Sequence, residues 1–351
     1  MNRSHVFVLL AYLTTFSVKA QITTIDEEKY LNINGIEQWI TIHGGDTSKP
    51  VLLFLHGGPG STMSQYDNTI YGGWEKDFIL VQWDQRGAGR TFGKNVPADY
   101  DEKYWIENPL TVEQMTDDGI AVSEYLIQRL GKQKIIILGT SWGSILGAKM
   151  ALKRPDLFHA YVGHAQMVSP AKDLISAYRK TLEIAREQKD IESVRRLDSL
   201  GIPPYDNAQN TGKFFRILKK YEREHSSPAP DSWWKLAPEY DNEIDGRHRY
   251  DGDDYSFVHF VGHKKLGIKA MNETVNFLED GLEFEIPVYF VQGKRDILTP
   301  PEITRAYFEK IKAPQKEYFL LPDAAHGHNQ AVVDTQYNIV KEFIYLGNGK
   351  G

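Results

Sequence analysis

The stretch IIILGTSWG at residues 135–143 decides the fold of this chain. Its first four residues form a short apolar run without alternation, as expected of a strand buried on both faces of a parallel sheet. The second half has the pattern G-x-S-x-G with Ser141 at its centre, and a helical pattern follows at residues 144–153. The glycines permit a sharp, strained turn that lifts Ser141 clear of the sheet. We therefore expect Ser141 to be a nucleophile; the alternative is an incidental serine at a Gly-rich helix entry.

Other strands are predicted on both sides of this stretch. Four further apolar runs lack alternation, at residues 51–55, 78–83, 288–291 and 318–321. A helical pattern at 112–130 has a capping box at its start and Gly131 as its stop. Asn34-Gly35 joins two short runs, which predicts an antiparallel hairpin at residues 29–42. Repeated strand, helix and strand predict an α/β fold, a mostly parallel sheet of roughly eight strands with helices on both faces.

The composition changes between residues 170 and 281. This segment is charged and helical at first, then rich in turn residues and aromatics, and it has no convincing buried strand. Because a buried strand follows at 288–291, the sheet domain resumes after the segment. We predict one core domain in two parts, residues 21–169 and 282–351, with an inserted, mostly helical lid at 170–281. A separate C-terminal domain would need its own sheet, for which too few strands remain.

Catalysis by Ser141 requires two more side chains. A serine hydroxyl is a weak nucleophile at neutral pH and needs a base that an acid orients. Asp296 follows the strand at 288–291 and His326 follows the strand at 318–321. Both would lie at the sheet edge that carries Ser141. The order serine, acid, histidine is that of the α/β-hydrolase fold, so these three residues form the predicted catalytic triad.

Each of these two partners has a rival nearby. His328 is the alternative base, two residues after His326, and we favour His326 because it is nearer the strand end. Asp323 is the alternative acid. Asp296 is favoured because it would reach the histidine from a neighbouring strand.

Five short motifs together resemble one peptidase group. They are HGGPG at 56–60, DQRGAGR at 84–90, GTSWGS at 139–144, GKRD at 293–296 and DAAH at 323–326. In this order and spacing they are similar to the proline iminopeptidase group of serine peptidases, within the α/β-hydrolase superfamily. A serine at position 141 in place of an aspartate argues against the haloalkane dehalogenase and epoxide hydrolase relatives.

The resemblance implies a role for each motif residue. Ser141 would attack the carbonyl of a peptide's first residue, His326 would transfer the proton, and Asp296 would hold the imidazole. The backbone N–H groups of Gly58 and Trp142 would form the oxyanion hole. No cofactor and no metal are implied. Arg86 could pair with a carboxylate of the site, but we favour a structural role in joining loops.

The resemblance also implies an activity, the release of an N-terminal residue, with proline favoured, from short peptides through an acyl-enzyme. In the family, acidic groups of the lid bind the substrate amine. The lid of this chain offers Trp233-Trp234 and the acids Glu239, Asp241, Glu243 and Asp245, but they do not align with the family pattern, so no amine-binding residue is assigned. Two alternatives are a carboxylic ester hydrolase or lactonase on the same scaffold, and a binding protein that has lost the chemistry.

Composition restricts the classes of function. The chain has 351 residues, a formal net charge of −6 at pH 7 and no long block of either sign. Because the chain has no cluster of basic residues, we do not expect nucleic acid as a partner. Cys is absent, which excludes disulfides and a cysteine nucleophile. His259 and His263 have helical i, i+4 spacing but no third ligand, so no metal site is predicted.

The first twenty residues have the form of a secretory signal peptide. A short, weakly basic start precedes an apolar stretch at residues 6–18, and Val18-Lys19-Ala20 fits a small-x-small cleavage site. We predict a signal peptide at 1–20 and export to the periplasm or the medium. No later segment reaches the length of a membrane span, so none is expected after cleavage. The sequence does not indicate an oligomeric state.

Overall fold

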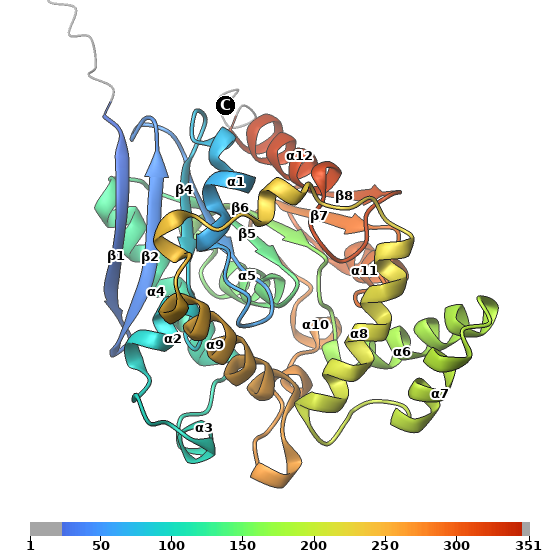
Figure 1. Cartoon of the computed structure of the whole chain (residues 1–351). Coiled ribbons are helices and arrows are strands. Elements are labelled where there is room, and N and C mark those ends of the chain that lie inside the picture. Colours follow the sequence, from blue (N-terminus) through green and yellow to red (C-terminus); the bar gives the residue numbers. More distant parts are fainter. Residues whose placement is uncertain (1–22, 346–351) are drawn as a thin grey trace, which may run out of the picture.

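The computed structural model describes residues 23–345, which contain one eight-stranded sheet in the order β1-β2-β4-β3-β5-β6-β7-β8 (Figure 1). The pairs β1·β2 and β2·β4 are antiparallel, and every other neighbouring pair is parallel. The predicted mostly parallel sheet and its antiparallel first pair are confirmed. The predicted signal peptide at 1–20 lies outside the described residues. The strands are β1 (Ile25–Ile33), β2 (Ile36–Gly44), β3 (Val51–Leu55), β4 (Ile79–Trp83), β5 (Ile135–Thr140), β6 (Phe158–His164), β7 (Val288–Gly293) and β8 (Lys316–Leu321).

Strand β6 is not among the strands predicted from the sequence. This strand has the sequence FHAYVGH, in which two histidines and a glycine interrupt the apolar pattern. It is nevertheless almost wholly buried, because β5 pairs with it on one side and β7 on the other. Its position in the middle of the sheet, rather than its composition, makes it a strand.

Helices cover both faces of the sheet (Figure 1). The helix predicted at 112–130 has those bounds in the structure. Thr111 Oγ1 accepts a hydrogen bond from the N–H of Gln114 (3.1 Å), and Gly131 ends the helix with a φ of +61°. Outside the lid, the helices are α1 (Asp67–Ile70), α2 (Gly89–Asn95), α3 (Glu102–Glu107), α4 (Val112–Leu130), α5 (Trp142–Lys153), α11 (Pro301–Lys310), α12 (Gln330–Asn338) and a π-helical turn at Ile339–Tyr345.

Two hydrophobic cores, one on each face, hold these helices to the sheet. In β5, Ile135 and Ile137 belong to the core that includes α4 and α5, whereas Ile136 and Leu138 belong to the core that includes α12. Successive side chains of a strand point to opposite faces. All four are buried, which explains why the run lacks alternation in the sequence.

The segment between β6 and β7 forms a helical lid. Residues 170–281 contain helices, short turns and, among strands, one isolated bridge pair. Three of the helices share a core of their own, to which Ile297 and Leu298 also contribute from the loop after β7. The bounds of the lid, 170–281, stay a prediction. Its helices are α6 (Pro170–Glu187), α7 (Ile191–Leu200), α8 (Ala208–Glu224), α9 (Glu243–Val261) and α10 (Phe277–Asp280).

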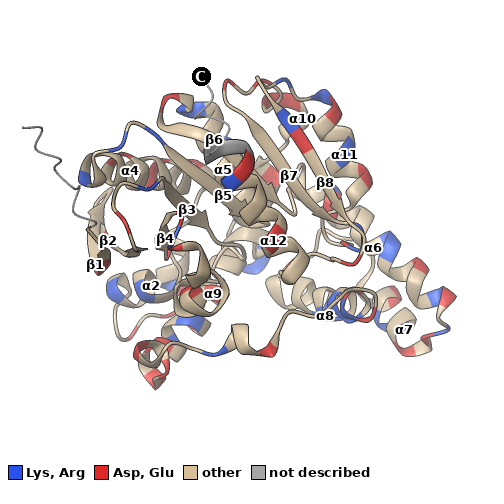
Figure 2. Cartoon of the chain, turned by 90° about the horizontal axis from the view of Figure 1, so that it is seen from above, with Lys and Arg blue, Asp and Glu red and all other residues tan. Residues whose placement is uncertain are grey.

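Helix α9 packs directly on the loops that follow β3 and β4. A Cβ added to Gly60 would lie 2.4 Å from the Cα of Asp253, so the HGGPG loop and α9 are in close contact. Ser256 Oγ donates a hydrogen bond to the carbonyl of Gly87 (2.7 Å). The lid is therefore joined to the loops at one edge of the sheet. In the view of Figure 2, acidic and basic residues are mixed over the helices.

Candidate active site

Ser141 occupies a strained turn between β5 and α5. Its φ is +54° and its ψ is −118°, a conformation that residues other than glycine seldom adopt. A Cβ added to Gly139 would lie 2.2 Å from the carbonyl oxygen of Gly143, and one added to Gly143 would lie 1.9 Å from the carbonyl oxygen of Leu55. Both glycines of the G-x-S-x-G pattern are thus required by close backbone packing.

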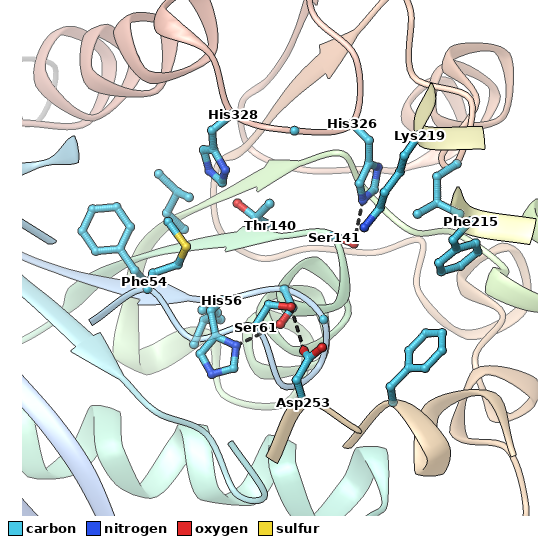
Figure 3. A pocket seen from close by; sticks show the side chains of 18 of the residues that line it. Phe54, His56, Ser61, Thr140, Ser141, Phe215, Lys219, Asp253, His326 and His328 are labelled. Atoms are coloured by element: carbon cyan, nitrogen blue, oxygen red, sulfur yellow. Dashed lines mark hydrogen bonds between the residues drawn. The ribbon is translucent and has the colours of Figure 1, made fainter. Parts of the chain in front are cut away.

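The structure brings the three predicted triad residues together. His326 Nε2 lies 2.9 Å from Ser141 Oγ, as the dashed line in Figure 3 shows. His326 Nδ1 lies 3.2 Å and 3.1 Å from the two carboxylate oxygens of Asp296. Asp296 follows β7 and His326 follows β8, at the end of the sheet where Ser141 follows β5. With a proton on Nδ1 donated to Asp296, Nε2 is free to accept the hydroxyl proton of Ser141.

The carboxylate of Asp296 is buried and fully supplied with donors. It accepts hydrogen bonds from the N–H of Thr299 (2.7 Å), the hydroxyl of Thr299 (2.5 Å) and the amide of Gln292 (3.0 Å). Burial opposes protonation of His326, but the charge of Asp296 and its hydrogen bond outweigh burial and raise the pKa of His326. The acid therefore favours the imidazolium that forms when the serine gives up its proton.

Neither rival residue has this geometry. His328 is half-buried beside His164, with the ring centroids 4.9 Å apart, and desolvation lowers its pKa to about 4. Asp323 is exposed, and its backbone carbonyl accepts hydrogen bonds from Ser227 and Asn329. The structure thus places His326 and Asp296 at the serine, as predicted.

The predicted oxyanion-hole residues lie beside the serine. Gly58 lines the same cavity as Ser141 and has a φ of +110°, and a Cβ there would lie 2.4 Å from the nitrogen of Gly60. Trp142 is the first residue of α5, where backbone N–H groups have no partner within the helix. Both positions suit an oxyanion donor, and that role stays a prediction.

A hydrogen-bond network joins three of the sequence motifs. It was not predicted from the sequence. His56 Nε2 accepts the N–H of Gln85 (3.1 Å), and the Gln85 amide donates to the carbonyl of His56 (3.0 Å). The Gln85 amide oxygen in turn accepts the indole N–H of Trp142 (2.9 Å). Burial lowers the pKa of His56 to about 4, so its ring is neutral and able to accept. Gln85 therefore fixes the HGGPG loop against the start of α5.

The cavity over Ser141 has a volume of about 400 Å³ and is closed on one side by the lid. Phe215, Arg216 and Lys219 of α8 line it, and so do Asp253 and Phe257 of α9. None of these residues was predicted from the sequence to lie at the site. Helix positions in a lid become neighbours of the serine only through the tertiary fold, and no local motif marks them.

Asp253 contributes a carboxylate to this cavity. Its Oδ1 accepts a hydrogen bond from Ser61 Oγ (2.9 Å), drawn in Figure 3. Burial raises the pKa of Asp253, while the hydrogen bond from Ser61 and the charge of Lys219 oppose the rise. Among the described residues that line the cavity, Asp253 is the one Asp or Glu, and it faces two cationic residues, Arg216 and Lys219.

Comparison with known proteins agrees with this fold. Residues 50–192 match the family described as alpha/beta hydrolase fold. This chain has the α/β-hydrolase fold. A probable aminopeptidase of Bacillus subtilis (strain 168), YbaC, is 29% identical over 302 residues, which are 85% of this chain and 90% of that protein. A probable proline iminopeptidase of Leptolyngbya boryana is 24% identical over 82% of this chain and 84% of its own length.

Solved structures show the same architecture. The crystal structure of a proline iminopeptidase from Mycobacterium smegmatis has a TM-score of 0.60 at 18% identity, covering 91% of this hydrolase and 98% of that chain. A thermophilic esterase from Thermogutta terrifontis has a TM-score of 0.55 at 18% identity, with 91% and 98% covered. At these identities the likeness shows the fold. The sequence likeness of this hydrolase is to proline iminopeptidases and aminopeptidases.

Two arginines of the DQRGAGR motif have structural partners in the hydrolase. Arg86 binds Asp118 of α4 through two hydrogen bonds, of 2.6 Å and 3.1 Å. This agrees with the structural role that we favoured for Arg86. Arg90 binds Asp245 of α9 through two bonds of 2.9 Å, and its guanidinium lies over the ring of Tyr240. Asp245, one of the lid acids singled out in the sequence, is thus paired with Arg90.

The two histidines with i, i+4 spacing also have structural roles. Both ring nitrogens of His259 lie near backbone carbonyls, those of Tyr255 (2.9 Å) and Trp105 (3.1 Å). His263 caps the turn after it and accepts the N–H of Leu266 (3.3 Å). No group of three possible metal ligands occurs between residues 23 and 345. Over the same residues, no helix of the hydrolase has the length and apolarity needed to cross a bilayer.

Proposed function

We propose that this α/β-hydrolase is a serine aminopeptidase of the proline iminopeptidase type, which releases the first residue of short peptides. The observation that carries the proposal is the Ser141, His326 and Asp296 constellation, set in a cavity whose lid contributes a carboxylate, Asp253. Of two relatives that match most of the chain, one is named a probable aminopeptidase and the other a probable proline iminopeptidase.

The geometry supports an acyl-enzyme mechanism. Ser141 Oγ attacks the carbonyl carbon of the first residue while His326 Nε2 takes the hydroxyl proton. The N–H groups of Gly58 and Trp142 bind the oxygen on which negative charge develops. His326 then gives the proton to the leaving amine, and the C–N bond breaks. A water molecule, deprotonated by His326, hydrolyses the ester on Ser141 and restores the enzyme.

Recognition of a free amino terminus is assigned to Asp253. Its carboxylate is in the cavity, opposite α8, and it is held by the hydroxyl of Ser61. A protonated substrate amine would form a charge-assisted hydrogen bond with it. Apolar side chains of Phe215, Phe257 and Leu298 line the same cavity and suit a compact first residue such as proline.

A panel of model substrates tests this function. We expect rapid turnover of prolyl and alanyl amides with a free amino group, and a loss of at least about a hundredfold in kcat/KM when that group is acetylated, as for a charge-assisted contact at the reacting residue. Asp253→Asn should remove most of this selectivity. Equal turnover of free and acetylated amides, or hydrolysis confined to short-chain esters, would contradict the peptidase proposal and favour an ester hydrolase or lactonase.

We also propose that the chain is exported after residues 1–20 are removed. The weakly basic start, the apolar stretch at 6–18 and the small-x-small site before Gln21 support this. Mass spectrometry of the protein from its own host should find a mature amino terminus at Gln21 in the exported fraction. A chain that keeps Met1 and stays inside the cell would contradict it.

A further inference from the structure

Helix α8 presents two cations to the cavity over Ser141. Gly212, Phe215, Arg216 and Lys219 line the cavity with the spacing i, i+3, i+4 and i+7, which is one face of a helix. Lys219 therefore lies on the side of α8 that lines the site, and Arg216 lies between this side and a second cavity that α7 and α8 line; both residues are exposed. Basic residues are visible along α8 in Figure 2.

The side chains of these two cations have no ion-pair or hydrogen-bond partner in the part of the chain that the structure describes. Within residues 23–345, neither Arg216 nor Lys219 forms an ion pair or a hydrogen bond through its side chain. Lys220, on the other side of the helix, pairs with Asp190, and Lys213 bonds to the side chain of Asn210 (3.2 Å). Among the described residues Arg223 of α8 likewise has no side-chain partner, but it does not line the cavity, whereas Arg216 and Lys219 do.

Lys219 is close enough to act on both walls of the site. Figure 3 draws its side chain among those that line the cavity, together with Ser141 and His326. Its charge opposes the rise in the pKa of His326, and it also opposes the rise in the pKa of Asp253 that burial causes on the opposite wall. Glu222, the next carboxylate along α8, accepts hydrogen bonds from the N–H groups of Ile297 (2.7 Å) and Leu298 (3.2 Å). It does not line the cavity.

The charge of Lys219 works against the imidazolium of His326, although the charges of Asp296 and Glu222 outweigh it. His326 must become an imidazolium during the reaction, and a nearby positive charge makes that state less stable. A negative group on the substrate would cancel the repulsion and would itself gain a charge-assisted contact. The cavity, of about 400 Å³, is at the small end of the range of ligand pockets and suits a short substrate.

We propose that Arg216 and Lys219 bind a carboxylate of the substrate, so that this enzyme acts on short peptides carrying a negative charge near the scissile bond. The carboxylate is either the free C-terminus of a dipeptide or the side chain of an acidic residue. Asp253, on the opposite wall, would bind the substrate amine. The site would therefore bind a substrate that carries both a positive and a negative charge. This inference rests on the aminopeptidase function proposed above.

Three matched peptides test the inference. Ala-Ala has a terminal carboxylate, Ala-Ala-amide has none, and Glu-Ala-amide has a side-chain carboxylate. We expect kcat/KM for at least one carboxylate-bearing peptide to exceed that for Ala-Ala-amide by about tenfold, the scale of one exposed charge-assisted contact. Which of the two peptides is preferred identifies the source of the carboxylate.

Variants on α8 assign the preference to the cations. Lys219→Met and Arg216→Met should each reduce the ratio of kcat/KM for the preferred peptide to kcat/KM for Ala-Ala-amide. Lys219→Glu should bring this ratio below one. Lys213→Met, the same substitution on the outer face of α8, should leave the ratio unchanged. A ratio of one in the wild type, or a ratio that Lys219→Met and Arg216→Met do not alter, would overturn the inference alone. Failure to cleave any of the three peptides, with esters still cleaved, would instead overturn the aminopeptidase function as well.

Discussion

At the scale of single residues, the site depends on which nitrogen of His326 carries a proton. The ring lies between a buried carboxylate and a serine hydroxyl, with Asp296 at Nδ1 and Ser141 at Nε2. Asp296 raises the pKa of His326 even though burial and Lys219 oppose this. His328, only two residues away, is neutral because burial lowers its pKa to about 4. Two histidines close in sequence thus differ through their neighbours alone.

The raised pKa of His326 predicts an acid limb in the pH profile. Protonated His326 cannot take the proton of Ser141, so kcat/KM should fall as the pH drops through a midpoint above the ordinary histidine value of 6.5. Asp296→Asn removes the charge that raises the pKa, so the limb should move to lower pH and the rate should fall by roughly four orders of magnitude. Rate profiles of both proteins check this; a limb that stays in place would contradict it.

Substitution of the two histidines separates the base from its neighbour. His326→Gln removes the group that activates Ser141, so kcat should fall by at least roughly a thousandfold. His328→Gln should keep the shape of the pH profile, because His328 does not contact Ser141. Steady-state kinetics of both variants provide the test. The assignment of the base is wrong if His328→Gln is the variant that loses the acid limb.

At the scale of elements, the turn from β5 to α5 fixes the position of the nucleophile. Gly139 and Gly143 let the backbone of the turn touch itself and β3, and Gln85 joins the start of α5 to the HGGPG loop. The strained φ of Ser141 is held by this packing. The glycines were predictable from the motif. The part played by Gln85 was not, because its partners come from different loops.

A methyl group at Gly143 should disrupt the turn. In Gly143→Ala the new Cβ would overlap the carbonyl oxygen of Leu55, a backbone atom that cannot move without shifting β3. We expect a loss of unfolding free energy of about 3 kcal/mol or more, measured by urea unfolding. Gly246→Ala is the matched control within α9, where the nearest atom is 3.9 Å away, and it should stabilise the protein by up to about 1 kcal/mol. Equal effects of the two substitutions would contradict the packing argument.

Loss of the Gln85 side chain should weaken both stability and catalysis. Gln85→Leu keeps the approximate volume but leaves the Trp142 indole N–H and the His56 carbonyl without their partner. Unpaired buried polar groups cost about 1–3 kcal/mol each, so urea unfolding should show a clear loss of stability, and kcat/KM should fall because the two proposed oxyanion donors, Gly58 and Trp142, lose their support. Gln330→Leu, at an exposed site on α12, should change stability by less than about 0.5 kcal/mol. An unaffected Gln85→Leu would show that the network does not position the loops.

At the scale of the whole molecule, local motifs predicted most strands of the sheet and the turn that carries Ser141. Strand β6 and the lid residues of the cavity depend on long-range contacts. The strand runs and the G-x-S-x-G turn were readable because each is a local pattern with a backbone cause. Strand β6 was missed because its neighbours in the sheet bury it in spite of its polar residues. The cavity residues of α8 and α9 were missed because the lid brings them to Ser141 from more than seventy positions away.

The most direct test of the central claim, that Ser141 is activated by His326 and Asp296, is the intact mass of the protein after reaction with a fluorophosphonate. We predict a single adduct that peptide mapping places on Ser141, absent in Ser141→Ala and formed much more slowly in His326→Gln and Asp296→Asn. An unlabelled wild-type protein, an adduct on another residue, or labelling at an unchanged rate in the two partner variants would contradict the account.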